Sequence, residues 1–151
     1  MKNLRKLLAV LMAGLMILFV AGCGGGSGSS GSGSGSGAPK AASNGKKVGV
    51  AMPTQSSQRW IQDGANMKQK LEALGYTVDL QYAEDDVQAQ VSQLENMITN
   101  GANCLVVASI DSSALVNVLA QAKQQNIPVI AYDRLLMDTD SVSYYATFDN
   151  K

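Results

Sequence analysis

The feature that most constrains this chain is the regular alternation of short apolar segments with amphipathic ones from Lys46 onward. The apolar segments have the length and composition of buried β-strands, and the amphipathic ones repeat apolar side chains every three or four positions, as helices do. We predict strands at residues 47–52, 77–82, 104–108, 128–132 and 142–148, and helices at 59–74, 87–100 and 114–125. This order predicts an α/β fold in which right-handed crossovers build a doubly wound parallel sheet.

Ligands of such sheets lie beyond the carboxyl ends of the strands, near the point where the strand order switches. In this chain those ends are the loops at residues 53–60, 83–86, 109–113 and 133–136. We therefore expect the functional residues in these four loops.

The first 45 residues differ from the rest and predict where the protein is located. Lys2, Arg5 and Lys6 precede an apolar run over residues 7–21, which ends in small residues and Cys23. A charged start, an apolar run shorter than the roughly 20 residues of a membrane span and a small-residue site are typical of a secretory signal peptide. The letters VAGC also resemble a bacterial lipobox, whose cysteine is lipidated. A plain signal peptide or a single membrane anchor is the alternative.

Glycine and serine alone make up residues 24–37, and this composition predicts a flexible tether. An engineered linker is the alternative origin. We predict three parts: a lipoprotein signal peptide at 1–22, lipidated Cys23 with a linker at 23–45, and a globular domain at 46–151. The domain is then extracytoplasmic and tied to the cell membrane by lipid, with a Gram-positive surface favoured over a Gram-negative periplasm.

Composition argues against several kinds of site. The globular part holds eight basic and twelve acidic residues, which disfavours a nucleic-acid partner. The chain contains no histidine, and Cys104 is left alone once Cys23 is assigned to the anchor. We therefore expect no zinc site, no Ser-His or Cys-His catalysis and no internal disulfide, with Cys104 a small buried hydrophobe. The acidic residues 84–86 offer too few converging oxygens for calcium, so a solvated turn that starts a helix is favoured there.

The loop after the first strand reads PTQSSQRW and ends in Arg59 and Trp60. It lacks the glycines of a dinucleotide-binding loop and of a phosphate-binding loop. An indole stacks against the C–H face of a sugar ring, and a guanidinium donates several hydrogen bonds to hydroxyl groups. The periodicity of the next helix favours a different role for Trp60, as the first core residue of that helix, and both roles stay open.

Asp133 and Arg134 directly follow the buried strand at 128–132. A carboxylate that accepts and a guanidinium that donates suit a neutral ligand with many hydroxyl groups, whereas a local ion pair is the alternative. Ser109 and Asp111 lie in the neighbouring loop and are weaker candidates, because such residues more often cap the next helix.

Five stretches, in order along the globular part, resemble one known family: VGVAMPTQSSQRWIQDG, LQYAEDD, QLENMITNGANCLVVASIDSSAL, IPVIAYDRL and VSYYATFDN. They resemble the periplasmic sugar-binding proteins of ABC transporters, and among these the multiple-monosaccharide group near the xylose- and ribose-binding proteins. The resemblance implies a type I periplasmic-binding-protein fold, with two α/β lobes, a hinge and a sugar between the lobes.

By this resemblance, Trp60 takes the position that stacks on the sugar and Arg59 makes a polar contact. Asp133 and Arg134 match the sugar-binding Asp-Arg pair, and Ser109 and Asp111 carry over more weakly. The implied function is capture of a pentose or hexose for an ABC permease, by a monomer that needs no cofactor or metal and breaks no bond. A sugar sensor that signals to a membrane receptor is the second hypothesis.

Members of this family continue into a second lobe beyond the position of Lys151, so we expect the sequence to be truncated or partial. One lobe alone is expected to bind sugar weakly or not at all, since the other lobe supplies half of the cleft. Two other classes fit less well. A flavodoxin-like enzyme needs a phosphate or flavin loop after the first strand, and a transcription regulator needs a helix-turn-helix where the signal peptide stands.

Overall fold

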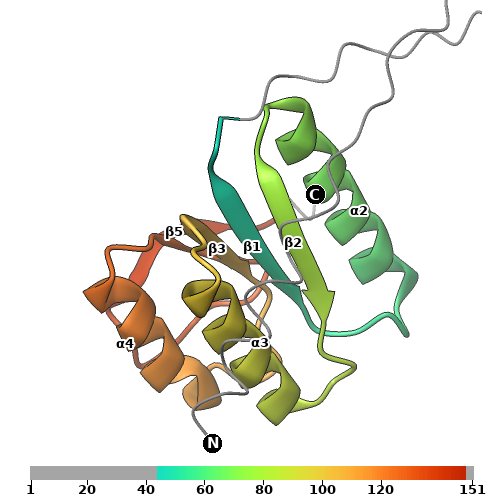
Figure 1. Ribbon diagram of the computed structural model, residues 1–151. Helices are drawn as coiled ribbons and strands as arrows, with labels where there is room; N and C mark the ends of the chain where they lie inside the picture. The colour runs from blue at the N-terminus through green and yellow to red at the C-terminus, as the bar shows by residue number, and fades with distance from the viewer. Residues whose placement is uncertain (1–43, 149–151) are drawn as a thin grey trace, which may run out of the picture. The chain divides into compact units, whose positions relative to one another are not determined.

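A computed structural model of the chain describes residues 44–148 (Figure 1). The predicted signal peptide, Cys23 and all but the last two residues of the predicted linker lie outside the described residues. Within 44–148, none of the helices combines the length and the hydropathy that a membrane crossing requires.

Five strands form one sheet in the order β2-β1-β3-β4-β5, and every neighbouring pair is parallel. The strands are β1 Lys47–Met52, β2 Thr77–Tyr82, β3 Cys104–Val107, β4 Val129–Tyr132 and β5 Val142–Ala146. The helices are α2 Gln58–Ala73, α3 Val87–Thr99 and α4 Val116–Gln124, the last preceded by the 3-10 turn η1 Ser113–Leu115. The predicted α/β class and doubly wound parallel sheet are confirmed, and the predicted elements differ from these by at most two residues at each end.

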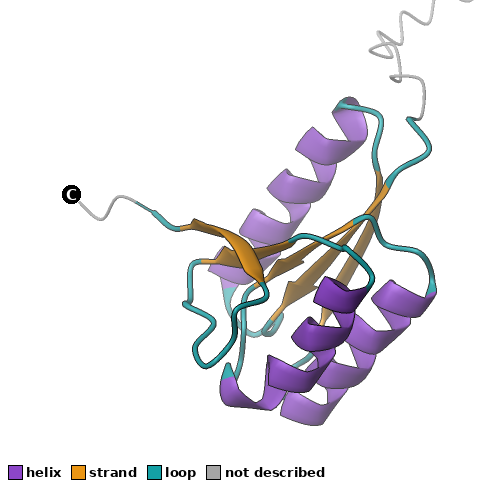
Figure 2. Ribbon diagram, turned by 90° about the vertical axis from the view of Figure 1, so that its left-hand side faces the viewer, coloured by secondary structure: helices purple, strands orange, loops and turns teal. Residues whose placement is uncertain are grey.

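The direction in which the chain crosses the sheet decides which face each helix covers. The step from β1 to β2 runs toward one edge, whereas the steps from β2 to β3 and from β3 to β4 run toward the other. Right-handed crossovers then place α2 on one face and α3 with α4 on the opposite face, as Figure 2 shows. The link from β4 to β5 contains no helix, but its Leu136 packs into the core on the α3 and α4 side.

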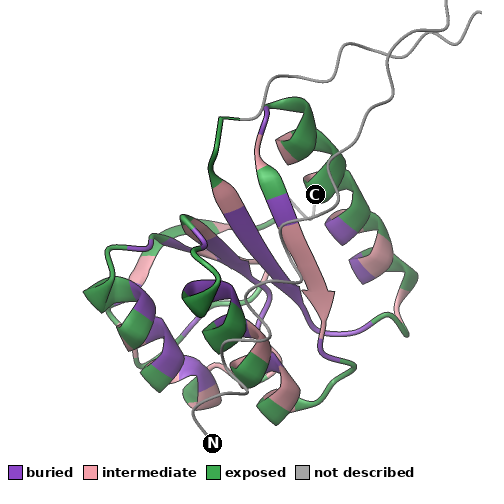
Figure 3. Cartoon of the chain, in the orientation of Figure 1, coloured by how far each residue is buried: buried purple, intermediate pink, exposed green. Residues whose placement is uncertain are grey.

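Two hydrophobic clusters fill the two sides of the sheet. Figure 3 colours the buried positions along the strands and helices from which they come. The larger one lies under α3 and α4, and we name this side the α3–α4 face; it includes Leu94, Met97, Leu105, Leu119 and Val129. The smaller one lies under α2, on what we name the α2 face, and it includes Val50, Met52, Trp60, Val78 and Val106. Cys104 is half-buried on the α2 face rather than fully buried as predicted.

The acidic turn before α3 acts as a helix start. The Asp86 carboxylate accepts hydrogen bonds from the N–H groups of Gln88 and Ala89 at 2.8 and 3.0 Å, which satisfies two of the free donors of the first helical turn. Among the described residues, no group of acidic or cysteine side chains is placed to hold a metal ion.

Candidate functional site

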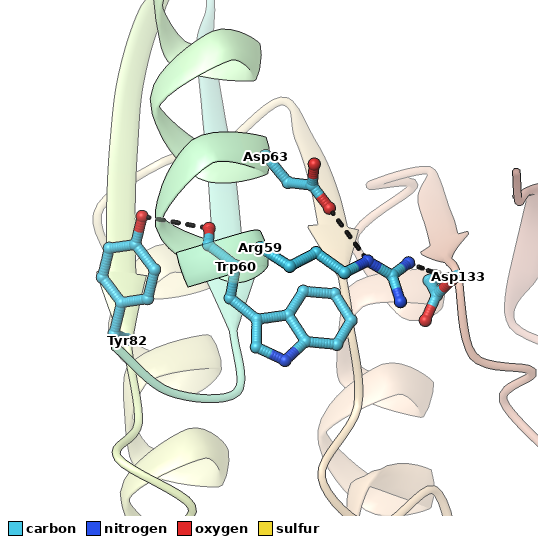
Figure 4. A network of polar contacts seen from close by, with 5 residues as sticks. All are labelled: Arg59, Trp60, Asp63, Tyr82 and Asp133. Atoms are coloured by element: carbon cyan, nitrogen blue, oxygen red, sulfur yellow. Dashed lines mark hydrogen bonds and ion pairs between the residues drawn. The ribbon is translucent and has the colours of Figure 1, made fainter. Parts of the chain in front are cut away.

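Four of the predicted site residues meet at the carboxyl ends of the strands, close to the switch in strand order at β1 and β3. Arg59 and Trp60 come from the first turn of α2, and Asp133 and Arg134 directly follow β4. These four residues form what we name the cation–indole cluster, part of which is drawn in Figure 4. Residues that are 74 positions apart in sequence are therefore in direct contact, as parallel strands allow.

Trp60 serves both the core and the cluster. Its side chain is only 6% exposed and packs with Val50 and Met52 on the α2 face, which bears out its role as the first core residue of the helix. Two guanidinium groups also lie over its ring, that of Arg59 at 4.7 Å and that of Arg134 at 5.3 Å from the ring centroid. At these distances a cation is attracted to the electron-rich ring face.

Arg59 connects the two segments of the cluster. Its Nη2 atom donates to the Asp133 carboxylate, and its Nε atom lies 3.5 Å from Oδ2 of Asp63, one helical turn further along α2 (Figure 4). The guanidinium also lies 4.8 Å from the centre of the Phe148 ring. The hydrogen bond to Asp133 raises the pKa of Arg59 above its ordinary value, so this group stays charged.

Asp133 has an unusual backbone conformation that its neighbours enforce. Its φ angle is 63°, in the left-handed region that costs most residues free energy. The Asp133 N–H donates to the Ala146 carbonyl at 2.7 Å, its carbonyl accepts from the Tyr145 hydroxyl at 3.0 Å, and the Arg134 N–H donates to the Tyr132 carbonyl at 2.7 Å. Strain held by so many contacts is a common property of ligand sites.

Arg134 is fixed by the loop that follows β3. Its Nη1 atom donates to the Ser109 carbonyl at 2.7 Å. The fully buried side chain of Gln90 binds the backbone on both sides of Ser109. Its Nε2 atom donates to the Ala108 carbonyl at 3.0 Å, and its Oε1 atom accepts from the Ile110 N–H at 2.9 Å. Ser109 thus reaches the cluster through its backbone.

Asp111 makes only local contacts. Its carboxylate accepts from the N–H and the hydroxyl of Ser113 at 2.9 and 2.7 Å. These hydrogen bonds lower the pKa of Asp111 and hold it just before η1, whose N-cap residue is Ser112. A role in a ligand site stays a prediction for this residue.

Sequence reasoning missed three neighbours of the cluster: Asp63, Tyr132 and Phe148. Burial, followed by the charge of Asp63, raises the pKa of Tyr132 to about 12. The Tyr132 and Phe148 rings meet edge to face at 5.8 Å between centroids. The spacing of Arg59 and Asp63 by four residues on a predicted helix was a signal that could have revealed Asp63, whereas no local signal marks Phe148.

The chemistry of this arrangement favours a neutral polar ligand. Two cations, Arg59 and Arg134, are matched by two carboxylates, Asp63 and Asp133, around one indole ring. The cations donate hydrogen bonds and the carboxylates accept them, each such bond to a charged group contributing about 1.5–3 kcal/mol. The balanced charge gives no advantage to a phosphate or to a free cation.

Comparisons with known proteins agree with this fold. Residues 48–151 match the family model described as "Periplasmic binding protein domain". The chain is 52% identical over 112 residues to the multiple sugar-binding periplasmic protein SbpA of Azospirillum brasilense, covering 74% of this chain and 31% of that protein. It is also 52% identical over 113 residues to the multiple sugar-binding periplasmic receptor ChvE of Rhizobium radiobacter, with coverage of 75% and 32%.

A solved structure is similar as well. It is an ABC transporter solute binding protein from Clostridium phytofermentans with bound β-D-glucose, with 66% identity, a TM-score of 0.68 and coverage of 70% of this chain and 32% of that one. The chain therefore spans about a third of the length of the relatives that it matches.

Proposed function

This chain belongs to the periplasmic binding protein domain family, and from that premise we propose that it captures a monosaccharide outside the cytoplasm for uptake by an ABC transporter. The observation that carries the proposal is the cation–indole cluster. It combines a flat aromatic ring with paired donors and acceptors at the edge of the sheet where such folds bind ligands. The matched relatives are named as sugar-binding proteins, which supports a binding role in which no bond is made or broken.

In the proposed complex, Asp133 accepts hydrogen bonds from sugar hydroxyls and Arg134 donates to them, while the C–H face of the sugar packs on Trp60. The present contacts of Arg59 place a condition on this arrangement. Its guanidinium lies over the indole and also engages the Asp133 carboxylate. A sugar that stacks on Trp60 and bonds to Asp133 must therefore release Arg59 from at least one of these two contacts.

We infer that the ligand is a pentose or a hexose, since the relatives include a D-xylose-binding protein and a structure with bound β-D-glucose. The test is calorimetric titration of the full-length protein, including the second lobe that the family resemblance implies, with arabinose, xylose, galactose, glucose and ribose. We expect a micromolar or tighter dissociation constant, about −8 kcal/mol or better, for at least one of these sugars. No binding to any of the five would overturn the proposal.

Two variants connect this binding to the cluster. Asp133→Asn removes the charge that accepts sugar hydroxyls, and Trp60→Phe keeps an aromatic core residue while reducing the stacking surface. Asp133→Asn is expected to weaken binding at least tenfold, in line with the loss of one hydrogen bond to a charged group. Trp60→Phe is also expected to weaken binding at least tenfold, because the smaller ring buries less of the sugar face. Asp138→Asn changes an exposed carboxylate in the same loop and is the matched control, so equal weakening there would contradict the assignment.

Sugar sensing is the second hypothesis, and the described residues give it no separate support. The two hypotheses predict different results in cells that lack the protein. Transport predicts that uptake of the labelled sugar is lost, whereas sensing predicts that uptake is kept and only the response to the sugar is lost.

We also propose that the protein is held at the membrane through lipid on Cys23, on the strength of the charged start, the apolar run and the VAGC sequence. Labelled fatty acid should be incorporated into the wild-type protein and not into Cys23→Ser. Incorporation into both proteins would contradict the anchor at this position.

A further inference from the structure

Asp63 is a half-buried carboxylate that neither the sequence predictions nor the proposed sugar contacts assign to a role. It lies on α2, four residues after Arg59, and its side chain is 17% exposed. Its Oδ2 atom is buried and has no hydrogen-bond partner among the described residues, while Arg59 Nε lies 3.5 Å away as a counter-charge. Asp63 also has a side-chain hydrogen bond with Tyr132, but its buried Oδ2 atom has only the nearby Arg59 guanidinium to offset the cost of its burial, so Asp63 and Arg59 stabilise each other.

The two carboxylates that hold Arg59 differ in where they are attached. Asp133 lies in the loop after β4, in a strained conformation, and is itself a proposed sugar ligand. Asp63 lies on the same helix as Arg59, so their separation is set by the helix itself. Binding groups are placed more accurately on helices than on loops, and Asp63 is therefore the anchor that persists when a ligand engages Asp133.

We propose that Asp63 is a positioning residue: it holds the Arg59 guanidinium over the Trp60 ring in the ligand-free chain, and beside the stacked sugar when a sugar hydroxyl replaces Arg59 on Asp133. Arg59 then remains a donor at the edge of the ligand instead of moving into solvent, where nearly half of its side chain already lies. This inference rests on the proposed function for the identity of the ligand, but the geometry of Arg59 is testable without ligand.

The first measurement concerns the ligand-free chain. In NMR spectra, the Arg59 Nε–Hε signal should be shifted upfield by the rings of Trp60 and Phe148, because the guanidinium lies within 5 Å of both ring centres. Asp63→Asn, which is isosteric and uncharged, should move this signal toward the position of a solvent-exposed arginine. Asp63→Glu keeps the charge and should retain most of the upfield shift. If both variants lose the shift, disturbed folding and not the missing charge is the cause.

The matched control is Glu72→Gln, which breaks the pair of Glu72 with Lys68 at 3.9 Å. That pair has the same four-residue spacing on the same helix, but it is exposed and distant in sequence from the cluster. It should leave the Arg59 signal unchanged. An unchanged signal in Asp63→Asn, or an equal change in Glu72→Gln, would overturn the proposal.

The second measurement is a double-mutant cycle on the affinity for D-glucose in the full-length protein. Asp63→Asn should weaken binding about fivefold in the wild-type background, a coupling usual for contacting side chains, and should have no further effect in Arg59→Gln. Equal weakening in both backgrounds would show that Asp63 acts through stability alone. If no sugar binds the wild type while Asp63→Asn still shifts the Arg59 signal, the sugar function fails and the positioning of Arg59 stands.

Discussion

The face of the sheet under α3 and α4 is closed, whereas the face under α2 is left partly open. On the α3–α4 face, Leu94, Met97, Leu105 and Leu119 are completely buried. On the α2 face a single helix contacts β1 and β2, and Tyr82, Cys104, Ile130 and Tyr132 around its core are only partly buried. Apolar burial contributes about 25 cal/mol per Å², so the closed face supplies more of the stability.

The difference shows how one small sheet serves both folding and binding. Arg59 and Asp63 lie on α2, and Trp60 forms the end of the α2-face core beside them. Charged side chains keep part of their hydration there because the face is not sealed. A sheet with two closed faces would be more stable, but it would have no place for such a cluster.

The largest difference in stability is expected when a leucine on each face is replaced by alanine. Leu119→Ala leaves a cavity under α4 and should lower the free energy of unfolding by about 2–5 kcal/mol. Leu71→Ala, on the half-open α2 face, removes a side chain that is only partly buried and should cost roughly half as much. Chemical denaturation, followed by the fluorescence of the single tryptophan, measures the unfolding free energy of both variants. Equal losses would show that the two faces do not differ in their contribution to stability.

Gln90 tests how much one buried amide on the closed face contributes to stability. Gln90→Leu leaves the Ala108 carbonyl and the Ile110 N–H without their partner, and two unsatisfied buried groups should cost about 2–4 kcal/mol in unfolding free energy. Gln93→Leu is the control on the same helix, because Gln93 makes one such bond, to Tyr82, and its Oε1 atom has no partner among the described residues. A loss in Gln93→Leu as large as that in Gln90→Leu would contradict this account.

One glycine on each face allows the same comparison of stability with a smaller change in volume. A Cβ atom on Gly49 would lie 2.7 Å from Met97 Sδ and 2.9 Å from a Leu105 methyl group inside the closed core, so Gly49→Ala should cost about 1–3 kcal/mol. A Cβ on Gly64 would lie too close to the Tyr82 hydroxyl and 3.1 Å from a Leu80 methyl group, but both of these groups are the ends of half-buried side chains. Alanine in place of glycine also favours the helix by about 1 kcal/mol, so Gly64→Ala should be nearly neutral. Thermal unfolding of both variants measures these changes in stability. A larger loss of stability for Gly64→Ala than for Gly49→Ala would contradict the expected order.

The sequence alone was sufficient for the fold because each element carries a local signal. Apolar runs marked the strands, helical spacing marked the helices, and Asp86 marked the start of α3. The parallel pairing of β4 with β5 was harder to foresee, because the link between them has no helix and is positioned by the burial of Leu136.

The site was predictable in part. Arg59, Trp60, Asp133 and Arg134 were identified by their places at strand ends and by family resemblance, and the structure brings them together. That the Arg59 guanidinium covers the indole and bridges two carboxylates was not foreseen, since it depends on contacts between distant segments. Nor does any local pattern show that Ser109 acts through its carbonyl, which the buried Gln90 holds in place.

A further effect expected from the half-open face concerns Tyr132 and appears only at alkaline pH. Burial and the Asp63 charge raise the pKa of Tyr132 to about 12 in the folded protein, against 10 for the ordinary group. The unfolded chain thus loses this proton before the folded chain does, and the stability that the neutral phenol provides is lost as the pH rises from about 10 to about 12. Tyr132→Phe should unfold with a flatter dependence on pH across this range, measured by denaturant titration at each pH. Tyr144→Phe changes an exposed ring and should keep the pH dependence of the wild-type protein. If its stability depends on pH as weakly as that of Tyr132→Phe, Tyr132 is not the source of the pH dependence.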